Sequence, residues 1–198
     1  MNQAKQALAI AARKGLVRSR DLASRGVSRV TLSRLERQGR LIRVARGLYA
    51  LPDHDASAFH SMVVAAARVP RAILCLLSAL RFHDLTTQQP PEVWIAIDTK
   101  ARKPTLEETS LHVVRFSERM RKLGVEDRVV EGVKIRVTSA ARTVVDCFRY
   151  RNKIGLDVAL EALRDYRRKY PRTMHEVWSL AQKLRALRVL RPYLEATA

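Results

Sequence analysis

The sequence of 198 residues is poor in features that mark secreted, membrane and disulfide-rich proteins. It has only two cysteines, Cys75 and Cys147, and each lies in an apolar stretch, which favours reduced core thiols over a disulfide. The sequence contains no run of 18 apolar residues, so it predicts no membrane-spanning helix. The N-terminus lacks the unbroken apolar region and cleavage site of a signal peptide. We therefore expect a cytoplasmic protein without a membrane partner.

Patterns that support catalysis are also missing. The five histidines are scattered, with no His/Cys pair at metal-ligand spacing, and none of the seven glycines forms a phosphate-binding loop. No Ser or Cys stands in a nucleophile elbow. We expect no catalytic residue, no metal and no cofactor. A less favoured alternative is a metal-dependent nuclease, because Glu92, Asp98 and Lys100 superficially resemble one end of a restriction-nuclease site.

Acidic residues are scarce relative to basic ones. The chain has 19 Asp and Glu against 38 Lys and Arg, a net charge of +19. Such a charge repels itself in a folded protein, which favours a polyanionic partner; nucleic acid is the commonest, and an anionic membrane surface is second. Residues 1–51 hold 12 of the basic residues but only two acids. This asymmetry predicts a basic, nucleic-acid-binding module at the N-terminus.

The first module has the pattern of a winged helix-turn-helix. An apolar stripe at helical spacing is closed by Gly15, and Ser19 is expected to cap a short second helix that ends before Gly26. Ser28 opens a third helix, which Gly39 closes. Residues 41–44 and 48–51 then predict a β-hairpin. We expect residues 1–52 to form the DNA-binding domain, with a hairpin wing directly after the recognition helix.

The third helix divides into two faces on a helical wheel. Leu32 and Leu35 fall on the face expected to pack inward. The opposite face is predicted to contact DNA bases through Val30, Ser33, Arg34 and Arg37. Phosphate and wing contacts are predicted for Arg20, Arg29, Arg43 and Arg46. The alternative is a three-helix cap whose basic face is merely solvated.

The second module, residues 53–198, is expected to be a larger α+β domain. Asp53 or Asp55 is expected to cap its first helix, and the apolar run 72–82 predicts a buried helix. Strands are expected at residues 93–97, 111–116, 125–130 and 133–137, and further helices at 139–148, 156–170, after 173, and at 187–196. The predicted fold class is thus α+β: an N-terminal winged helix-turn-helix, then a domain with a small sheet and C-terminal helices.

Several stretches, in this order, resemble AbiEi-type antitoxins. They are Val27–Tyr49, Leu77–Leu80, His83–Thr86, Pro91–Ile97 and Thr138–Asp146. The resemblance implies a non-enzymatic antitoxin of a bacterial type IV toxin-antitoxin (abortive infection) operon, associated with the nucleoid. It further implies that the winged helix binds inverted repeats of double-stranded DNA in its own promoter and represses transcription.

The resemblance also implies that the C-terminal domain counteracts a nucleotidyltransferase-like toxin. Type IV antitoxins do this without a stable toxin complex, although direct contact stays open here. No C-terminal residue can be assigned to the antitoxin activity by this resemblance. A ligand-responsive winged-helix regulator unrelated to a toxin is a second alternative, beside the nuclease.

Overall fold

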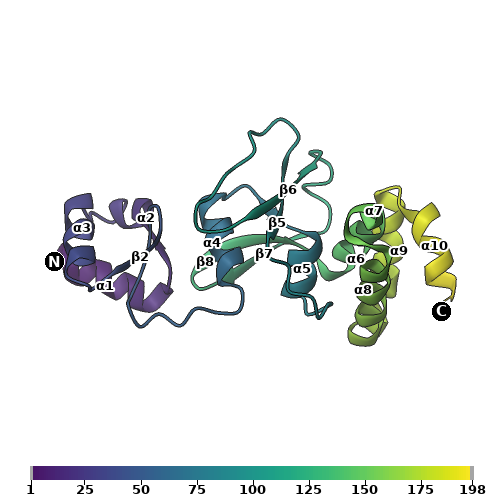
Figure 1. Cartoon of the computed structure of the whole chain (residues 1–198), viewed down its shortest axis with the longest axis horizontal. Helices are drawn as coiled ribbons and strands as arrows, with labels where there is room; N and C mark the ends of the chain where they lie inside the picture. The colour runs from purple at the N-terminus through teal and green to yellow at the C-terminus, as the bar shows by residue number, and fades with distance from the viewer. Residues whose placement is uncertain (1, 197–198) are drawn as a thin grey trace. The chain divides into compact units, whose positions relative to one another are not determined.

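The computed structural model describes residues 2–196, and over these residues the fold is α+β with two small sheets (Figure 1). The chain divides into two units: residues up to 70 together with 128–135, and residues 71–127 together with 136 onward. Among the described residues, no helix is both long and apolar enough to cross a membrane. The expected boundary after residue 52 stays a prediction.

Three helices open the first unit: α1 (Gln3–Lys14), α2 (Ser19–Ala23) and α3 (Arg29–Arg37). The side chain of Asn2 caps α1 by accepting a hydrogen bond from the amide of Ala4, and Ser28 caps α3 as expected. The expected cap at Ser19 is wrong, because this residue is the first of α2 and Arg18 occupies the cap position without a side-chain bond. Buried apolar side chains from all three helices form one core.

The wing is a hairpin of β2 (Ile42–Ala45) and β3 (Leu48–Ala50), and a two-residue strand, β1 (Val17–Arg18), pairs with the free edge of β3. All pairs are antiparallel, in the order β1-β3-β2. The tip residue Gly47 has φ +74°, and its carbonyl accepts a hydrogen bond from the amide of Ser19. A Cβ there would lie 3.1 Å from the Ser19 hydroxyl, so the position favours glycine.

A further helix of the first unit, α4 (His60–Arg68), follows an irregular segment after the wing. The expected caps Asp53 and Asp55 are wrong, since Phe59 occupies the cap position and makes no side-chain cap bond. Residues 62–67 of α4 are all buried. The tip of the hairpin between β7 (Val125–Val130) and β8 (Val133–Thr138) also belongs to this unit.

The second sheet has the strand order β6-β5-β4-β8-β7. β5 (Val93–Asp98) and β6 (Leu111–Phe116) are parallel along their whole length, and β4 (Ile73–Leu74) pairs antiparallel with β5 and parallel with β8. The run 72–82, expected as one buried helix, is therefore a strand followed by α5 (Leu76–Phe82). A strand buried in the middle of a sheet is apolar on both faces, so its sequence resembles that of a buried helix.

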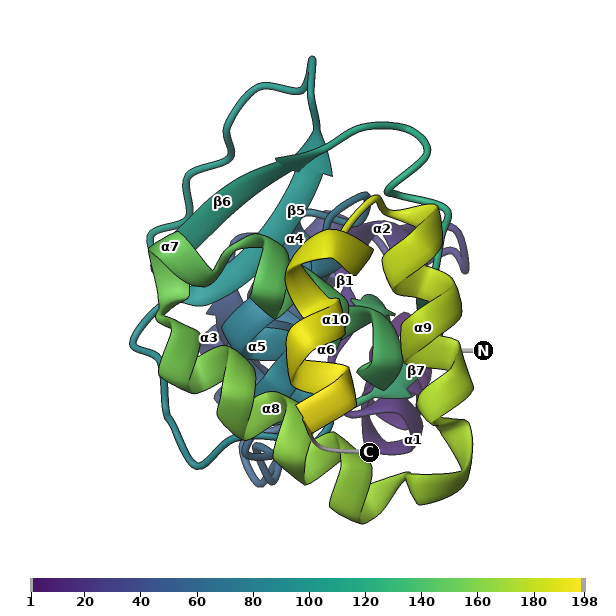
Figure 2. The ribbon, with the colours of Figure 1, turned by 90° about the vertical axis from the view of Figure 1, so that its right-hand side faces the viewer.

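The core of the second unit surrounds α6 (Ala140–Arg149), which Ser139 caps as expected. The other elements are α7 (Arg151–Ile154), α8 (Leu156–Lys169), the 3₁₀ turn η1 (Pro171–Thr173), α9 (Met174–Lys183) and α10 (Leu187–Ala196). In Figure 2, α10 lies in front of α6, with α8 and α9 to either side, and all three helices contact α6. Both cysteines are free and buried, which confirms the prediction of reduced core thiols.

Candidate nucleic-acid interface

The two faces of α3 differ in exposure in the way that the helical wheel predicts. Leu32 and Leu35 are 2% and 0% exposed and pack in the core of the first unit. Val30 on the opposite face is 79% exposed. Arg34 and Arg37 are exposed and Ser33 is partly buried. The four residues predicted to contact bases thus lie on the outward side of one helix, while their role stays a prediction.

The N-terminal end of α3 is fixed to α1 by Gln3, a residue to which the sequence assigned no role. Its side-chain oxygen accepts hydrogen bonds from the amide of Ser28 at 3.1 Å and from the hydroxyl of Thr31 at 2.9 Å. The hydroxyls of Ser28 and Thr31 are also hydrogen-bonded to each other, at 2.9 Å. This network sets the direction of the helix that carries the exposed arginines. No sequence pattern announces it, because Gln3 lies 25 residues or more from its partners.

The basic side chains of this surface are largely not neutralised. Over residues 2–196, no carboxylate forms an ion pair with Arg29, Arg34 or Arg43. Arg37 donates to the hydroxyl of Ser33 at 3.3 Å, and Arg20 has a loose, exposed contact of 3.7 Å with Asp21. An exposed ion pair of that length contributes little. The surface therefore offers several guanidinium groups to an anion from outside.

The wing carries the remaining two predicted contacts. Arg43 is exposed on β2, just before an irregularity in the pairing with β3, and Arg46 is exposed at the tip beside Gly47. The carbonyl of Arg46 accepts a hydrogen bond from Arg68, which holds the tip of the wing. Partial burial lowers the pKa of Arg18, and the nearby Arg20 lowers it further. An anion bound at this surface would weaken the repulsion between these two cations.

The residues behind the nuclease alternative lie far apart. Glu92 immediately precedes β5 and Asp98 ends it, so the two carboxylates are separated by about 20 Å at roughly 3.3 Å per residue. Glu92 accepts hydrogen bonds from Ser110 and His112. Asp98 accepts from Arg121 and from the amide of Lys100. This geometry does not bring the two carboxylates to one metal ion.

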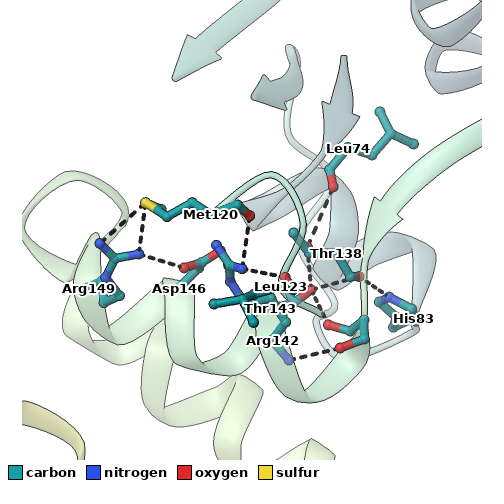
Figure 3. Close-up of polar contacts among 10 residues, drawn as sticks. Leu74, His83, Met120, Leu123, Thr138, Arg142, Thr143, Asp146 and Arg149 are labelled. Carbon is teal, nitrogen blue, oxygen red and sulfur yellow. Dashed lines mark hydrogen bonds and ion pairs between the residues drawn. The ribbon is translucent and has the colours of Figure 1, made fainter. Parts of the chain in front are cut away.

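The stretch Thr138–Asp146 forms a buried polar network at the start of α6 (Figure 3). Arg142 and Asp146 are both fully buried and form an ion pair at 2.8 Å. Arg142 also donates to the carbonyls of Met120 and Leu123, at 3.2 and 2.6 Å. Burial raises the pKa of Asp146, against the opposite influence of Arg142 and Arg149. These contacts tie α6 to the segment 120–123, which is a structural role.

The ligand-responsive alternative has one feature in its favour. A surface pocket of about 480 Å³ in the second unit is lined by Leu163, Arg164, Arg167, Arg168 and Pro171. Three arginines favour an anionic ligand, but arginines are also common on helix faces that are exposed to solvent. A response to a ligand stays a prediction.

The structure brings together residues that the sequence left apart. His54, His60 and Glu131 each place a potential metal-ligand atom within 4.8 Å of the other two. The histidines are scattered along the sequence, but the fold places two of the five beside one carboxylate. The sequence gives no sign of this cluster, because Glu131 lies 71 and 77 residues from the two histidines.

Comparisons with known proteins bear on the N-terminal module. A crystal structure of the RV2827C protein from Mycobacterium tuberculosis is similar at 18% identity and a TM-score of 0.48, covering 73% of this chain and 59% of that one. No curated protein matches the chain. Residues 5–52 match the family described as the transcriptional regulator, AbiEi antitoxin. The match confirms the N-terminal part of the resemblance inferred from the sequence, because residues 5–52 carry α1–α3 and the wing. The stretches from Leu77 to Asp146 lie outside the matched residues, and their resemblance stays a prediction.

Proposed function

We propose that this protein is a DNA-binding transcriptional autorepressor and the antitoxin of a type IV toxin-antitoxin operon. The observation that supports this best is the outward face of α3, where Arg34 and Arg37 stand exposed beside Val30 within an AbiEi-type segment. The contacts of Gln3 hold that face in a fixed direction.

In the proposed complex, α3 enters the major groove of its promoter. Arg34 and Arg37 donate to the O6 and N7 acceptors of guanine, and Val30 contacts a thymine methyl group. Arg20, Arg29, Arg43 and Arg46 bind phosphates and fix the register of the helix on the duplex. Two copies bind the two halves of an inverted repeat, one copy per half-site. Repression results from occupancy of the promoter and needs no catalytic step.

The antitoxin activity is assigned to residues 53–198. Their functional partner is a nucleotidyltransferase-like toxin encoded in the same operon, and the protein acts in the bacterial cytoplasm, on the nucleoid. Direct contact with the toxin is not required by the proposal. Because promoter binding and neutralisation use different residues, a substitution on the outward face of α3 should weaken promoter binding and leave neutralisation unchanged.

A reporter under the chain's own promoter tests the repressor activity. Arg34→Ala should relieve repression, whereas Arg188→Ala, an exposed arginine on α10, removes the same charge and should leave repression intact. Both variants should still rescue growth when co-expressed with the toxin. Equal repression by wild type and Arg34→Ala would reject the assigned face. Failure of the wild type to rescue would reject the antitoxin activity while leaving the repressor activity in place.

A further inference from the structure

A cluster of two histidines and one glutamate lies in the first unit, outside the proposed DNA-binding face. His54 belongs to the segment after β3, His60 is the first residue of α4, and Glu131 occupies the turn between β7 and β8. One carboxylate oxygen of Glu131 lies 3.1 Å from Nε2 of His54 and 2.8 Å from Nδ1 of His60. Three separate segments thus direct one nitrogen or oxygen atom each to a common point.

The carboxylate of Glu131 is held in this orientation by Ser57. Its other oxygen accepts hydrogen bonds from the amide and the hydroxyl of Ser57, at 2.9 and 2.7 Å. Burial raises the pKa of Glu131, but the hydrogen bonds from Ser57, His54 and His60 outweigh it and lower the pKa to about 2. The group is therefore a carboxylate at neutral pH. In metal sites, a carboxylate or imidazole that binds the ion is typically held in position by a hydrogen bond to its other oxygen or nitrogen atom.

The backbone at the turn indicates that glutamate is retained there against its conformational preference. Glu131 has φ +48° and Gly132 φ +71°, the pattern of a tight hairpin turn that favours Asn, Asp or Gly at the first position. The carbonyl of Glu131 accepts a hydrogen bond from the amide of Leu16 at 3.1 Å, so the tip is docked at the end of α1. Strain of this kind is often kept where a side chain is needed at one place.

We propose that His54, His60 and Glu131 bind one divalent metal ion of the zinc class, with a fourth position open to water. Two imidazoles and one carboxylate form a ligand set that Zn²⁺ accepts. In a tetrahedral site with bonds of about 2.0–2.1 Å, the ligand atoms lie about 3.3–3.4 Å apart. The two separations between histidine and Glu131, 3.1 and 2.8 Å, are shorter than this by a few tenths of an ångström, and the two histidine nitrogens lie within 4.8 Å of each other. Partial exposure of His60, at 30%, gives the ion a path from solvent.

The chemistry of binding is an exchange of protons for metal. Without the ion, Nε2 of His54 and Nδ1 of His60 carry hydrogens that they donate to Glu131. To bind the ion, each neutral imidazole moves its hydrogen to the other ring nitrogen, and an imidazolium releases a proton to water. Binding therefore weakens in acid. The bound ion joins the segment after the wing, the start of α4 and the hairpin tip beside α1, and so braces the module that carries α3.

The chain also contains a natural comparison for this site. His112 and Glu92 form a contact of 3.2 Å in the second unit, with the carboxylate supported by Ser110. Their side chains are 37% and 40% exposed, and within the described residues 2–196 no second histidine joins them. A site with one histidine and one carboxylate has too few protein ligands for tight zinc binding. His112→Asn is thus a matched control for the substitutions below.

The test is a zinc titration of the tag-free, full-length protein after removal of metal by a chelator. Competition with a chromophoric chelator gives stoichiometry and affinity, and Co²⁺ replaces Zn²⁺ for absorption spectroscopy. Wild type should bind one equivalent. His54→Gln and His60→Asn each keep a hydrogen-bonding group near Glu131. Loss of a group that only supports a metal ligand lowers affinity by roughly 10–100-fold, and each of these two variants should lower the zinc affinity by more than that. Ser57→Ala should fall within that range, and His112→Asn should change nothing.

Two further measurements keep the outcome clear if a variant folds poorly. The Co²⁺ spectrum of the wild type should show intense tetrahedral bands without a sulfur-to-cobalt charge-transfer band, because both cysteines are buried. Thermal unfolding in chelator shows whether each variant is folded before metal is added. Less than one equivalent bound by wild type, a thiolate band, or equal affinity in wild type and folded His60→Asn would each overturn the proposal. Loss of binding in His112→Asn would place the ion at the other pair and also overturn it.

Discussion

The arginines of α3 and those of α6 occupy opposite environments. Arg34 is exposed, and among residues 2–196 no acidic side chain pairs with it. Arg142 is completely buried, and its guanidinium donates to Asp146 and to two backbone carbonyls. Burying a charge is costly unless it is paired, whereas an exposed charge remains available to a partner. The same residue type is thus structural where its hydrogen bonds end inside the protein and a candidate for binding where they do not.

The carboxylates show a parallel contrast. Asp146 and Glu131 both accept hydrogen bonds from basic side chains. Burial dominates at Asp146 and raises its pKa, whereas at Glu131 four hydrogen bonds outweigh burial and lower it. The first carboxylate is part of an ion pair buried in a core, and the second is held as a carboxylate by hydrogen bonds from its neighbours. The hydrogen-bond partners decide which of the two results.

The largest expected effect is on the buried pair of α6. Asp146→Asn leaves the buried guanidinium of Arg142 without the negative charge of Asp146. This should lower the free energy of unfolding, measured by urea denaturation, by about 3–5 kcal/mol. Asp165→Asn, which breaks the surface pair with Arg168, should cost at most about 1 kcal/mol. A loss below about 1 kcal/mol for Asp146→Asn would remove the distinction between buried and exposed arginines.

The next effect is on base recognition by α3. Arg34→Ala should weaken binding to the cognate site by about 1–3 kcal/mol and relax the base preference at one position, because a bidentate contact with guanine is lost. Fluorescence anisotropy with the cognate duplex and single-base variants measures both changes. Thermal stability should be unaltered, since the exposed side chain of Arg34 forms no hydrogen bond or ion pair among residues 2–196. Unchanged affinity together with unchanged base preference would show that the outward face of α3 is not the reading face.

A smaller effect concerns the acid stability of the first unit. Because the pKa of Glu131 in the folded chain is about 2, below its usual 4.5, its contribution to stability is fully present above about pH 4.5 and is lost as the pH falls toward 2. Glu131→Gln should therefore make stability less dependent on pH within that window. Chemical denaturation in chelator at several pH values measures this. Parallel curves for wild type and variant would mean that the hydrogen bonds do not lower this pKa.

The smallest effect is expected at the wing. Arg43→Ala removes a predicted phosphate contact, so it should weaken binding about equally for all DNA sequences and reduce the slope of log affinity against log salt by about 1. Titrations at several salt concentrations measure that slope. A change in base preference would instead assign Arg43 to sequence recognition.

The sequence predicts the parts of the fold that depend on local pattern. The inward and outward faces of α3 follow from helical periodicity, and the turn at Glu131-Gly132 follows from the glycine between two β-branched runs. The two-residue strand β1 is too short to produce a pattern. The apolar run that contains Ile73 and Leu74 predicts a helix, although these two residues form a strand, because apolar runs of that length fit either structure.

The candidate sites differ in the same way, in whether they depend on a local sequence pattern. The exposed face of α3 is visible in the sequence because its residues recur within one helix. The support that Gln3 gives to Thr31 and the grouping of His54, His60 and Glu131 both depend on contacts between distant segments. Such contacts are set by the packing of the whole unit, and one sequence alone carries no periodic signal for them.

The most direct test of the proposed repressor is a gel-shift titration of the protein against its own upstream DNA and a scrambled duplex, at low and near-physiological salt. The proposal predicts preferential binding to the upstream duplex that persists at the higher salt. Equal binding to both duplexes, lost together as salt rises, would mean that the positive charge acts only through counterion release, and would contradict the proposal.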